Sequence, residues 1–494
     1  MSVFSVEIFL VVFGLALLCL EALVPTLTRR TLSLLSISGV ALGLVLFIFS
    51  TKSVEALPAF VQPFHQLDSL AIFYKGFALV ITLLVLWLMV ESEGYLTKFT
   101  PGGKYGELFC LPILVCVGMM WMASAKDLVT VFVSLELVTV SFYVLVAFAR
   151  KSNLALEAGV KYLILGALST GVLVYGIAWV YGTTGAMSFE GISAGLAKAS
   201  TSKQAALLGA AFLLAGLGFK VAAAPFQMWV PDVYQGAPIP VTTFLSVGSK
   251  AAGFVVLTRA VQAFTAPGSI IAVEVQQLLL VGGALTVLLG SLPAMFQTSV
   301  KRLLAYSSIS HAGYLLLALG AGSARFDLSP GGVVAFYLAT YLPMTVLGFL
   351  VLALLRSSGS GEDLRDFRGL AQRNPLLALI MTLALASLAG LPLTAGFMGK
   401  LFVFLGLVDQ AAWGPLVCAV IGAAAGFYYY FRTILAMYTK DSGKVEPLTI
   451  QIGAKAGAVA LAVVIVILGV YPKPLQQLLA PAPVATTVVA AEAK

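Results

Sequence analysis

Long apolar runs separated by short polar segments make up most of this 494-residue chain. A helix needs about 20 mostly apolar residues to cross the hydrocarbon core of a bilayer, and fourteen runs meet that requirement. They lie near residues 6–25, 31–50, 69–90, 106–124, 127–149, 157–182, 204–225, 240–263, 276–296, 303–321, 331–355, 375–408, 412–437 and 455–472. The pattern therefore predicts an all-α integral membrane protein with about fourteen transmembrane helices.

Two of these spans contain helix breakers. In span seven, the stretch AAFLLAGLGFKVAAAPFQMWVP places Pro225 five residues after Lys220. The run from Leu376 to Val408 would form a single helix about 50 Å long, whereas the hydrocarbon core is about 30 Å thick. Its centre, LAGLPLTAGFMG, contains Pro392. We expect helices seven and twelve to be discontinuous.

The two interrupted helices are five spans apart. Two copies of a five-helix unit would produce this spacing, and an odd number of helices per unit inverts one copy in the membrane. The halves share no obvious sequence identity, so spacing alone supports the repeat. It predicts an N-terminal three-helix segment (1–105), a first five-helix repeat (106–263), a second repeat (276–440), and a C-terminal helix with a tail (441–494).

Basic residues are unevenly shared between alternate loops. Of the 29 lysines and arginines, fourteen follow odd-numbered spans, seven follow even-numbered spans or lie in the tail, and the others lie in or beside spans. Because cytoplasmic loops are enriched in Lys and Arg, we expect a multi-pass protein of the plasma or inner membrane with both termini outside, on the periplasmic side. The formal charge of +8 forms no patch, which argues against nucleic acid as a partner.

Cofactor motifs are missing from the chain. The stretch GLGFKV at Gly216 lacks the third glycine and the preceding strand of a dinucleotide-binding fingerprint. Four cysteines lie in apolar runs without a CxxC motif or metal-ligand spacing: Cys19, Cys110, Cys116 and Cys418. We therefore expect this chain to bind no metal and no redox cofactor.

Several ionisable residues fall inside the predicted spans, where each charge costs at least about 2.5–3.5 kcal/mol on insertion scales. Glu157 and Lys161 are four residues apart on span six, so they share a helix face on which they can pair. The other members are Glu136 in span five, Lys220 in span seven, Lys250 in span eight, His311 in span ten and Lys400 in span twelve.

Two interpretations of these charges are open. Lysines near helix ends can extend to the membrane surface, which fits Lys75, Lys455 and also Lys161. His311 among serines can be a hydrogen-bonded core residue. The alternative is a proton path. A buried lysine loses affinity for its proton and a nearby carboxylate restores it. Water held beside the breaks at Pro225 and Pro392 would connect such groups.

Six stretches carry a resemblance to a known family. They are DLVTVFVSLEL around Glu136, EAGVKYLILGALSTG around Lys161, FKVAAAPFQMWVPDVYQGAP around Lys220, PVTTFLSVGSKAAGF around Lys250, KRLLAYSSISHAGY around His311, and GLPLTAGFMGKLFVF around Lys400. With them the chain resembles subunit N of the proton-pumping NADH–quinone oxidoreductase, complex I, most clearly from span four to span thirteen. The PDVYQGAP ending, which contains Asp232, and the lysine at 400 favour subunit N over the related L and M subunits.

The resemblance implies roles for individual residues. Glu136 and Lys220 match the family's pair on spans five and seven, and Lys250 matches its central connecting lysine. Lys400 matches the residue placed toward the periplasmic side. His311 and Lys161 match positions in the central hydrophilic axis.

One position departs from the family pattern. The family usually has histidine where this chain has Gln227. Glutamine does not titrate. Either the position is not needed as a proton relay here, or it acts through hydrogen bonding.

The function implied by the resemblance is proton translocation coupled to quinone reduction elsewhere in a complex. Electrons from NADH or another donor would travel through other subunits. Neighbouring antiporter-like and small membrane subunits and the lipid bilayer would be the partners. Two alternatives remain: a subunit of a multisubunit sodium/proton antiporter, and a stand-alone secondary transporter that binds a small solute at half-helix ends.

Overall fold

The computed structural model describes the chain except for residues 1–2, 25–27, 53–56, 100–104, 199, 323–327, 441–446 and 481–494. Part of the predicted C-terminal segment therefore lies outside the described residues. So do four of the basic residues used in the loop comparison: Lys104, Arg325, Lys444 and Lys494.

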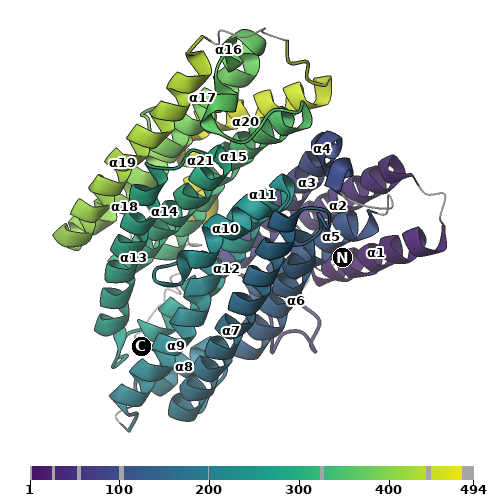
Figure 1. Cartoon of the computed structure of the whole chain (residues 1–494). Coiled ribbons are helices and arrows are strands. Elements are labelled where there is room, and N and C mark those ends of the chain that lie inside the picture. The colour runs from purple at the N-terminus through teal and green to yellow at the C-terminus, as the bar shows by residue number, and fades with distance from the viewer. Residues whose placement is uncertain are drawn as a thin grey trace, which may run out of the picture.

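The described residues form a bundle in which most of the central helices run roughly along one common direction, whereas α1, α2 and α20 lie at an angle to it (Figure 1). The helices that precede the second repeat are α1 Val3–Leu23, α2 Arg29–Lys52, α3 Ser69–Glu91, α4 Glu93–Phe99, α5 Gly106–Ser124, α6 Leu128–Val146, α7 Asn153–Thr184, α8 Phe189–Leu196, α9 Lys203–Val221, η2 Phe226–Met228, α10 Trp229–Gly236, α11 Ile239–Phe244, the π-helical turn η3 Leu245–Ser249 and α12 Lys250–Phe264. The remaining helices are α13 Ala272–Ala294, α14 Val300–Ala321, α15 Pro330–Ser357, η4 Leu364–Phe367, α16 Leu370–Arg373, α17 Pro375–Ala389, α18 Ala395–Asp409, α19 Trp413–Tyr438, α20 Ile452–Val470 and α21 Lys473–Leu479.

The number of spans agrees with the sequence prediction. Within the described residues, 13 helical segments are long and apolar enough to cross a membrane. The remaining predicted span is the pair α17 and α18, each 15 residues long. Each alone would measure about 22 Å, shorter than the hydrocarbon core, so the two together form span twelve.

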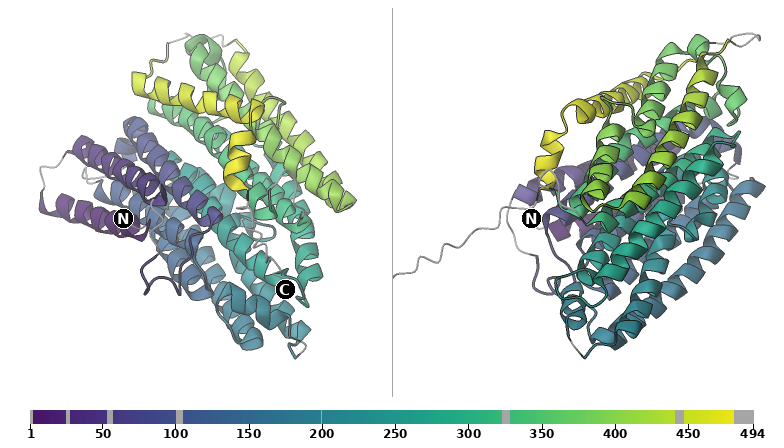
Figure 2. Two further views of the ribbon diagram at one scale, coloured as in Figure 1. Left: turned by 180° about the vertical axis from the view of Figure 1, so that it is seen from behind. Right: turned by 90° about the vertical axis from the view of Figure 1, so that its left-hand side faces the viewer.

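Helices at the centre of the bundle are buried on all sides, and helices at its edge are not. Burial reaches 94% over the apolar windows of the α11–α12 segment, α14 and α15, but only 33% over those of α1 and α7. In Figure 1 and in the left panel of Figure 2, α1 and α2 lie on one side of the bundle and α19 lies on the other. The central helices carry Lys250 and His311, which places polar side chains where no lipid reaches.

Span seven is broken, as predicted. Helix α9 ends at Val221, and Ala222 adopts a left-handed conformation with φ of 66°. The chain then passes Pro225 and η2 before α10 begins at Trp229. The indole N–H of Trp229 donates to the carbonyl oxygen of Phe219 at 3.0 Å, so the second half-helix caps the first.

Span twelve is broken in a similar way. Helix α17 ends at Ala389, and Gly390 follows with φ of 94°, a conformation that favours glycine. Residues Leu391–Thr394, including the exposed Pro392, separate the two half-helices, and Leu393 has φ of 70°. Both predicted breaks are therefore confirmed.

The two ends of the bundle can be told apart by their loops. We use "basic end" for the end that holds the loops after α6, α10, α13 and α15, where Arg150, Arg302 and Arg356 lie. There the amide of Val300 donates to the Glu362 carbonyl at 2.8 Å. At the opposite end, isolated β-bridges join His65 to Ala125 and Asp127 to Ser188.

Lys75 corrects a prediction. Its side chain does not extend to a surface but is only 1% exposed, and its ammonium forms an ion pair with Glu7 of α1. Trp121 of α5 donates its indole N–H to the other oxygen of Glu7 at 3.0 Å. Because α1, α3 and α5 enclose this position, the lysine has no route to the interface and is paired instead. Lys455 is exposed, as expected.

Candidate functional site

Glu136 of α6 and Lys220 of α9 lie near each other but do not touch. Lys220 is 8% exposed, and its Nζ donates to Thr139 Oγ1 at 3.0 Å. The half-buried Glu136 accepts a hydrogen bond from Thr170 of α7 at 2.9 Å. Although the structure describes both residues, no ion pair joins them. Thr139 is three residues after Glu136 on the same helix face, so a hydroxyl group stands beside both charges.

Lys250 occupies the centre of the bundle. It is the first residue of α12 after the π-helical turn η3, a feature that often marks functional sites. Its ammonium donates to both the carbonyl and the hydroxyl oxygen of Ser308 on α14. Ser246 of η3 bonds the same hydroxyl group at 3.3 Å and that of Tyr341 at 2.9 Å. Lys250 is therefore held by neutral oxygen atoms.

His311 lies three residues after Ser308 on α14 and is enclosed by tyrosines. Its Nδ1 is 2.8 Å from the hydroxyl of Tyr337, and its Nε2 is 3.4 Å from the hydroxyl of Tyr430. A neutral imidazole has one donor and one acceptor nitrogen, and a tyrosine hydroxyl can serve either. A proton that reached one nitrogen could therefore leave from the other.

Lys400 caps the end of the first half-helix at the break in span twelve. Its Nζ donates to the carbonyl oxygens of Leu388 at 2.9 Å and Ala389 at 2.8 Å, at the end of α17. A helix C-terminus leaves carbonyl groups without partners and carries a partial negative charge. The ammonium group therefore satisfies oxygens that the break exposes. Lys400 also lies 5.4 Å from the ring centroid of Tyr314.

These residues form one polar row across the bundle. A Cβ placed on Gly253, one turn after Lys250, would lie 3.8 Å from the Cβ of Lys220. A Cβ on Gly399, next to Lys400, would lie 3.0 Å from the ring of Tyr337, which bonds His311. The row therefore runs from Glu136 through Lys220, Lys250 and His311 to Lys400. The sequence alone indicates these five residues one by one, without an order in space.

Sequence reasoning missed the hydroxyl groups between these charges. They are Thr139, Thr170, Ser246, Ser308, Tyr337, Tyr341 and Tyr430. The sequence could have indicated two of these groups. Tyr337 and Tyr341 are four residues apart, so their hydroxyl groups share one face of α15.

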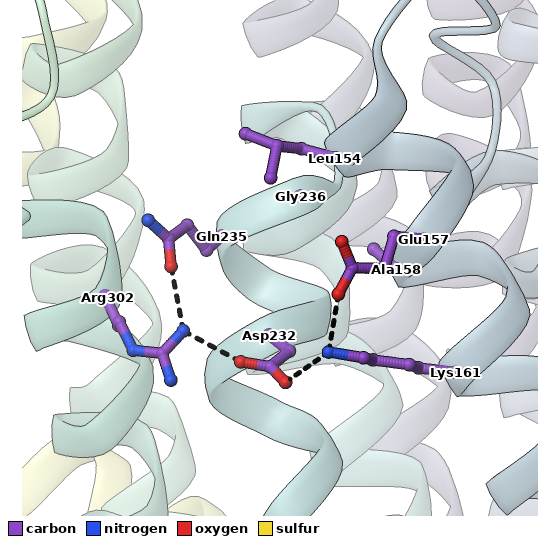
Figure 3. A pocket seen from close by; sticks show the side chains of 8 residues that line it. All are labelled: Leu154, Glu157, Ala158, Lys161, Asp232, Gln235, Gly236 and Arg302. Carbon is purple, nitrogen blue, oxygen red and sulfur yellow. Dashed lines mark hydrogen bonds and ion pairs between the residues drawn. The ribbon is translucent and has the colours of Figure 1, made fainter.

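Lys161 lies at the basic end, beside a pocket of about 170 Å³ (Figure 3). Its Nζ is 2.7 Å from Glu157 Oε1, which confirms the predicted pairing, and 2.8 Å from Asp232 Oδ2. The other oxygen of Asp232 binds Arg302 at 2.8 Å, and Arg302 also donates to Gln235 at 2.8 Å. Asp232 thus joins α7 to α14.

Gln227 lies in η2, inside the break of span seven. Its Oε1 is buried and has no hydrogen-bond partner among the residues that the structure describes. The neighbouring Phe226 and Met228 are exposed, as is Pro225. A buried acceptor without a partner is unfavourable. The position that departs from the family pattern is thus also poorly satisfied.

Within the described ranges, no group of three or more His, Cys, Asp or Glu residues could hold a metal ion.

Comparison with known proteins identifies the family. The family model described as "NADH:quinone oxidoreductase/Mrp antiporter, TM" matches residues 125–427. The chain is 36% identical over 494 residues to NADH-quinone oxidoreductase subunit N of Desulfitobacterium hafniense, covering 97% of each chain. A chain of respiratory complex I from Thermus thermophilus matches with a TM-score of 0.79 and 32% identity, covering 97% of this chain and 100% of that one.

A more distant structure shares the fold. A chain of the Mrp complex from a Dietzia species matches with a TM-score of 0.78 at 20% identity, covering 96% of both chains. The identity to subunit N is higher and extends over nearly the full length of both proteins. The chain therefore belongs to the family of NADH–quinone oxidoreductase subunit N.

Proposed function

We propose that this chain moves protons across the membrane through the row from Glu136 to Lys400, as a membrane-arm subunit of a quinone oxidoreductase complex. The observation that carries the proposal is the position of Lys250. It lies at the buried centre of the bundle, and its hydrogen bonds within the described residues go to neutral oxygen atoms alone. Because no carboxylate in the described part of the chain pairs with Lys250, the lysine can gain or lose its proton without breaking an ion pair.

The contacts of the other lysines support the same chemistry. Lys220 is held by a threonine hydroxyl and Lys400 by two backbone carbonyls. Among the described residues, neither forms an ion pair, so either can lose its proton without leaving a carboxylate unpaired. Serine, threonine and tyrosine hydroxyls between them can donate and accept protons. Glu136 supplies the carboxylate at the other end of the row.

The energy for this transport comes from reactions on other subunits. Homologues of this chain are subunits of an oxidoreductase, so it acts as one part of an enzyme complex. In our proposal, NADH or another donor and a quinone react elsewhere in the complex. Changes in neighbouring subunits then alter the charges along the row.

The setting in the membrane follows from the family. The chain is a multi-span protein of a respiratory complex, and other subunits of that complex are its partners. We further propose antiporter-like and small membrane subunits as neighbours in the plasma or inner membrane, with the basic end facing the cytoplasm and both termini outside. We also propose the division into 1–105, 106–263, 276–440 and 441–494, with the two central units as inverted repeats.

A Lys250→Ala variant of the complete complex tests the proposal. Protons moved per quinone reduced should fall at least about tenfold, while the complex assembles normally. The exposed Lys455→Ala serves as the matched control and should behave as wild type. Unchanged proton movement in the assembled Lys250→Ala complex would overturn the proposal.

One observation favours a second candidate function. The matching family model covers Mrp antiporters as well as NADH:quinone oxidoreductases. A sodium/proton antiporter would move protons in response to a sodium gradient without any quinone. Co-purification of quinone reductase activity with the tagged chain separates the two functions.

A further inference from the structure

The pocket at the basic end lies between three elements, α7, α10 and α14 (Figure 3). Its volume of about 170 Å³ is enough for several water molecules. The charged side chains around it are Glu157, Lys161, Asp232 and Arg302. The side chain of Lys161 is 41% exposed, so it is open to water, whereas that of Arg302 is 29% exposed.

Asp232 divides its two carboxylate oxygens between two cations. One oxygen is 2.8 Å from Lys161 on α7, and the other is 2.8 Å from Arg302 on α14. Lys301, which precedes Arg302, donates to the carbonyls of Gln235 at 3.0 Å and Ala237 at 2.7 Å, and it lies 3.7 Å from Glu362. Helix α14 thus binds the C-terminal end of α10 through Lys301 and the carboxylate of Asp232, also on α10, through Arg302.

The two cations differ in one decisive property. An arginine keeps its proton at any pH that proteins meet, whereas a lysine can release its proton. When Lys161 gives a proton to a water molecule in the pocket, Asp232 still has Arg302 as its partner. Glu157 loses its partner, but its side chain is 58% exposed and is stabilised by water. Arg302 therefore allows Lys161 to lose its charge without leaving the Asp232 carboxylate unpaired.

The pocket is lined in part by α10, the second half-helix of span seven. Tyr162 follows Lys161, and its ring lies 4.9 Å from that of Trp229, centroid to centroid. Trp229 caps the carbonyl of Phe219, the residue before Lys220. The ring of Trp229 also stacks on that of Phe219 at 5.3 Å, so aromatic contacts connect the residue after Lys161 with the residue before Lys220.

We propose that Arg302 is a positioning residue for proton uptake: by sharing Asp232 with Lys161, it keeps Lys161 able to exchange its proton with water in the pocket. This inference rests on the proposed function. Without the arginine, Lys161 is the only cation among the residues that line the pocket, and it faces two carboxylates. Both carboxylates then favour the charged form of Lys161, so the lysine releases its proton only at a higher pH.

Arg302→Gln in the complete complex provides the test. The pH profile of proton movement should shift about one unit toward alkaline pH, with severalfold less movement at pH 7. Arg302→Lys keeps the charge and should restore most of the wild-type profile. Lys151→Gln removes an exposed cation at the same end, outside the pocket, and should leave the profile unchanged.

The outcomes distinguish this inference from the proposed function. If Arg302→Gln assembles and its profile does not move while Lys250→Ala stops proton movement, the role of Arg302 is wrong and the row stands. If Lys250→Ala moves protons normally, the proposed function fails first. A purely structural role for Arg302 would lower the yield of complex in both Arg302 variants without moving either pH profile, and it would also overturn the inference.

Discussion

The ammonium group of Lys400 lies 2.8 Å from the carbonyl oxygen of Ala389, the last residue of α17. The break in the helix and the buried charge thus satisfy each other. The break frees carbonyl oxygens, and the lysine on the second half-helix donates to them. A proton leaving Lys400 would weaken this cap, so the charge of Lys400 and the geometry of the break are physically coupled.

Replacing Lys400 with methionine should affect both stability and transport. The change leaves the carbonyls of Leu388 and Ala389 without a charged donor, which costs about 1–3 kcal/mol. Proton movement per quinone reduced should fall severalfold. Reconstituted complex in vesicles gives the transport measurement, and thermal unfolding gives the stability. Transport at the wild-type level would contradict the role of Lys400.

The pair between Glu7 and Lys75 predicts a strongly non-additive stability effect. Both side chains are 1% exposed, so removing one leaves the other as an unpaired buried charge. Lys75→Met alone should therefore cost about 3–5 kcal/mol, and Glu7→Gln combined with it should recover most of this. A double-mutant cycle on the yield and denaturant resistance of the complex measures the coupling. Additive single effects would show that the pair contributes little.

Much of the fold could be predicted from the sequence because its strongest signals are local. Apolar runs of span length gave the number of helices, and Pro225, Gly390 and Pro392 marked both breaks. The burial of Lys75 was not predicted, because the seventh residue of a spanning helix normally lies near the membrane surface. Its burial depends on α1 and α5, which are distant in the sequence.

The candidate site could be predicted only in part. Charged residues in apolar runs stand out, so Glu136, Lys250 and Lys400 were found. Ser308 and Tyr430 are ordinary in any helix, and only the packing of α14 against α12 and α19 gives them a role. Arg302 was counted as a loop charge, because its contact with Asp232 joins residues 70 positions apart.

A substitution at Gln227 distinguishes the two interpretations of this position: that it is not needed for proton transfer, or that it acts through hydrogen bonding. Because its Oε1 is buried and has no partner within the described part of the chain, we expect that this atom accepts no essential hydrogen bond. Gln227→Leu should leave proton movement within about twofold of wild type and should stabilise the chain by about 1 kcal/mol. Proton pumping and thermal unfolding of the assembled complex check both expectations. A loss of pumping in Gln227→Leu would assign the amide a part in transport.

His65 lies outside the spanning helices, at the end of the bundle opposite the basic end, and should make stability depend on pH. Burial, with a smaller contribution from the charge of Lys75, lowers the pKa of His65 from 6.5 to about 4. Its Nδ1 lies 2.9 Å from the hydroxyl of Ser124. The folded chain keeps the ring neutral, whereas the unfolded chain binds a proton below about pH 6.5. Stability from this group is therefore present above pH 6.5 and is lost as the pH falls toward 4.

The loss should be about 1–2 kcal/mol after allowing for the partial exposure of the ring. His65→Gln keeps a polar side chain that cannot titrate, so its stability should change less between pH 6.5 and pH 4. Chemical unfolding of the complex at a series of pH values measures the difference between variant and wild type. Parallel pH curves for the two would show that the His65 ring is protonated equally in the folded and unfolded chain.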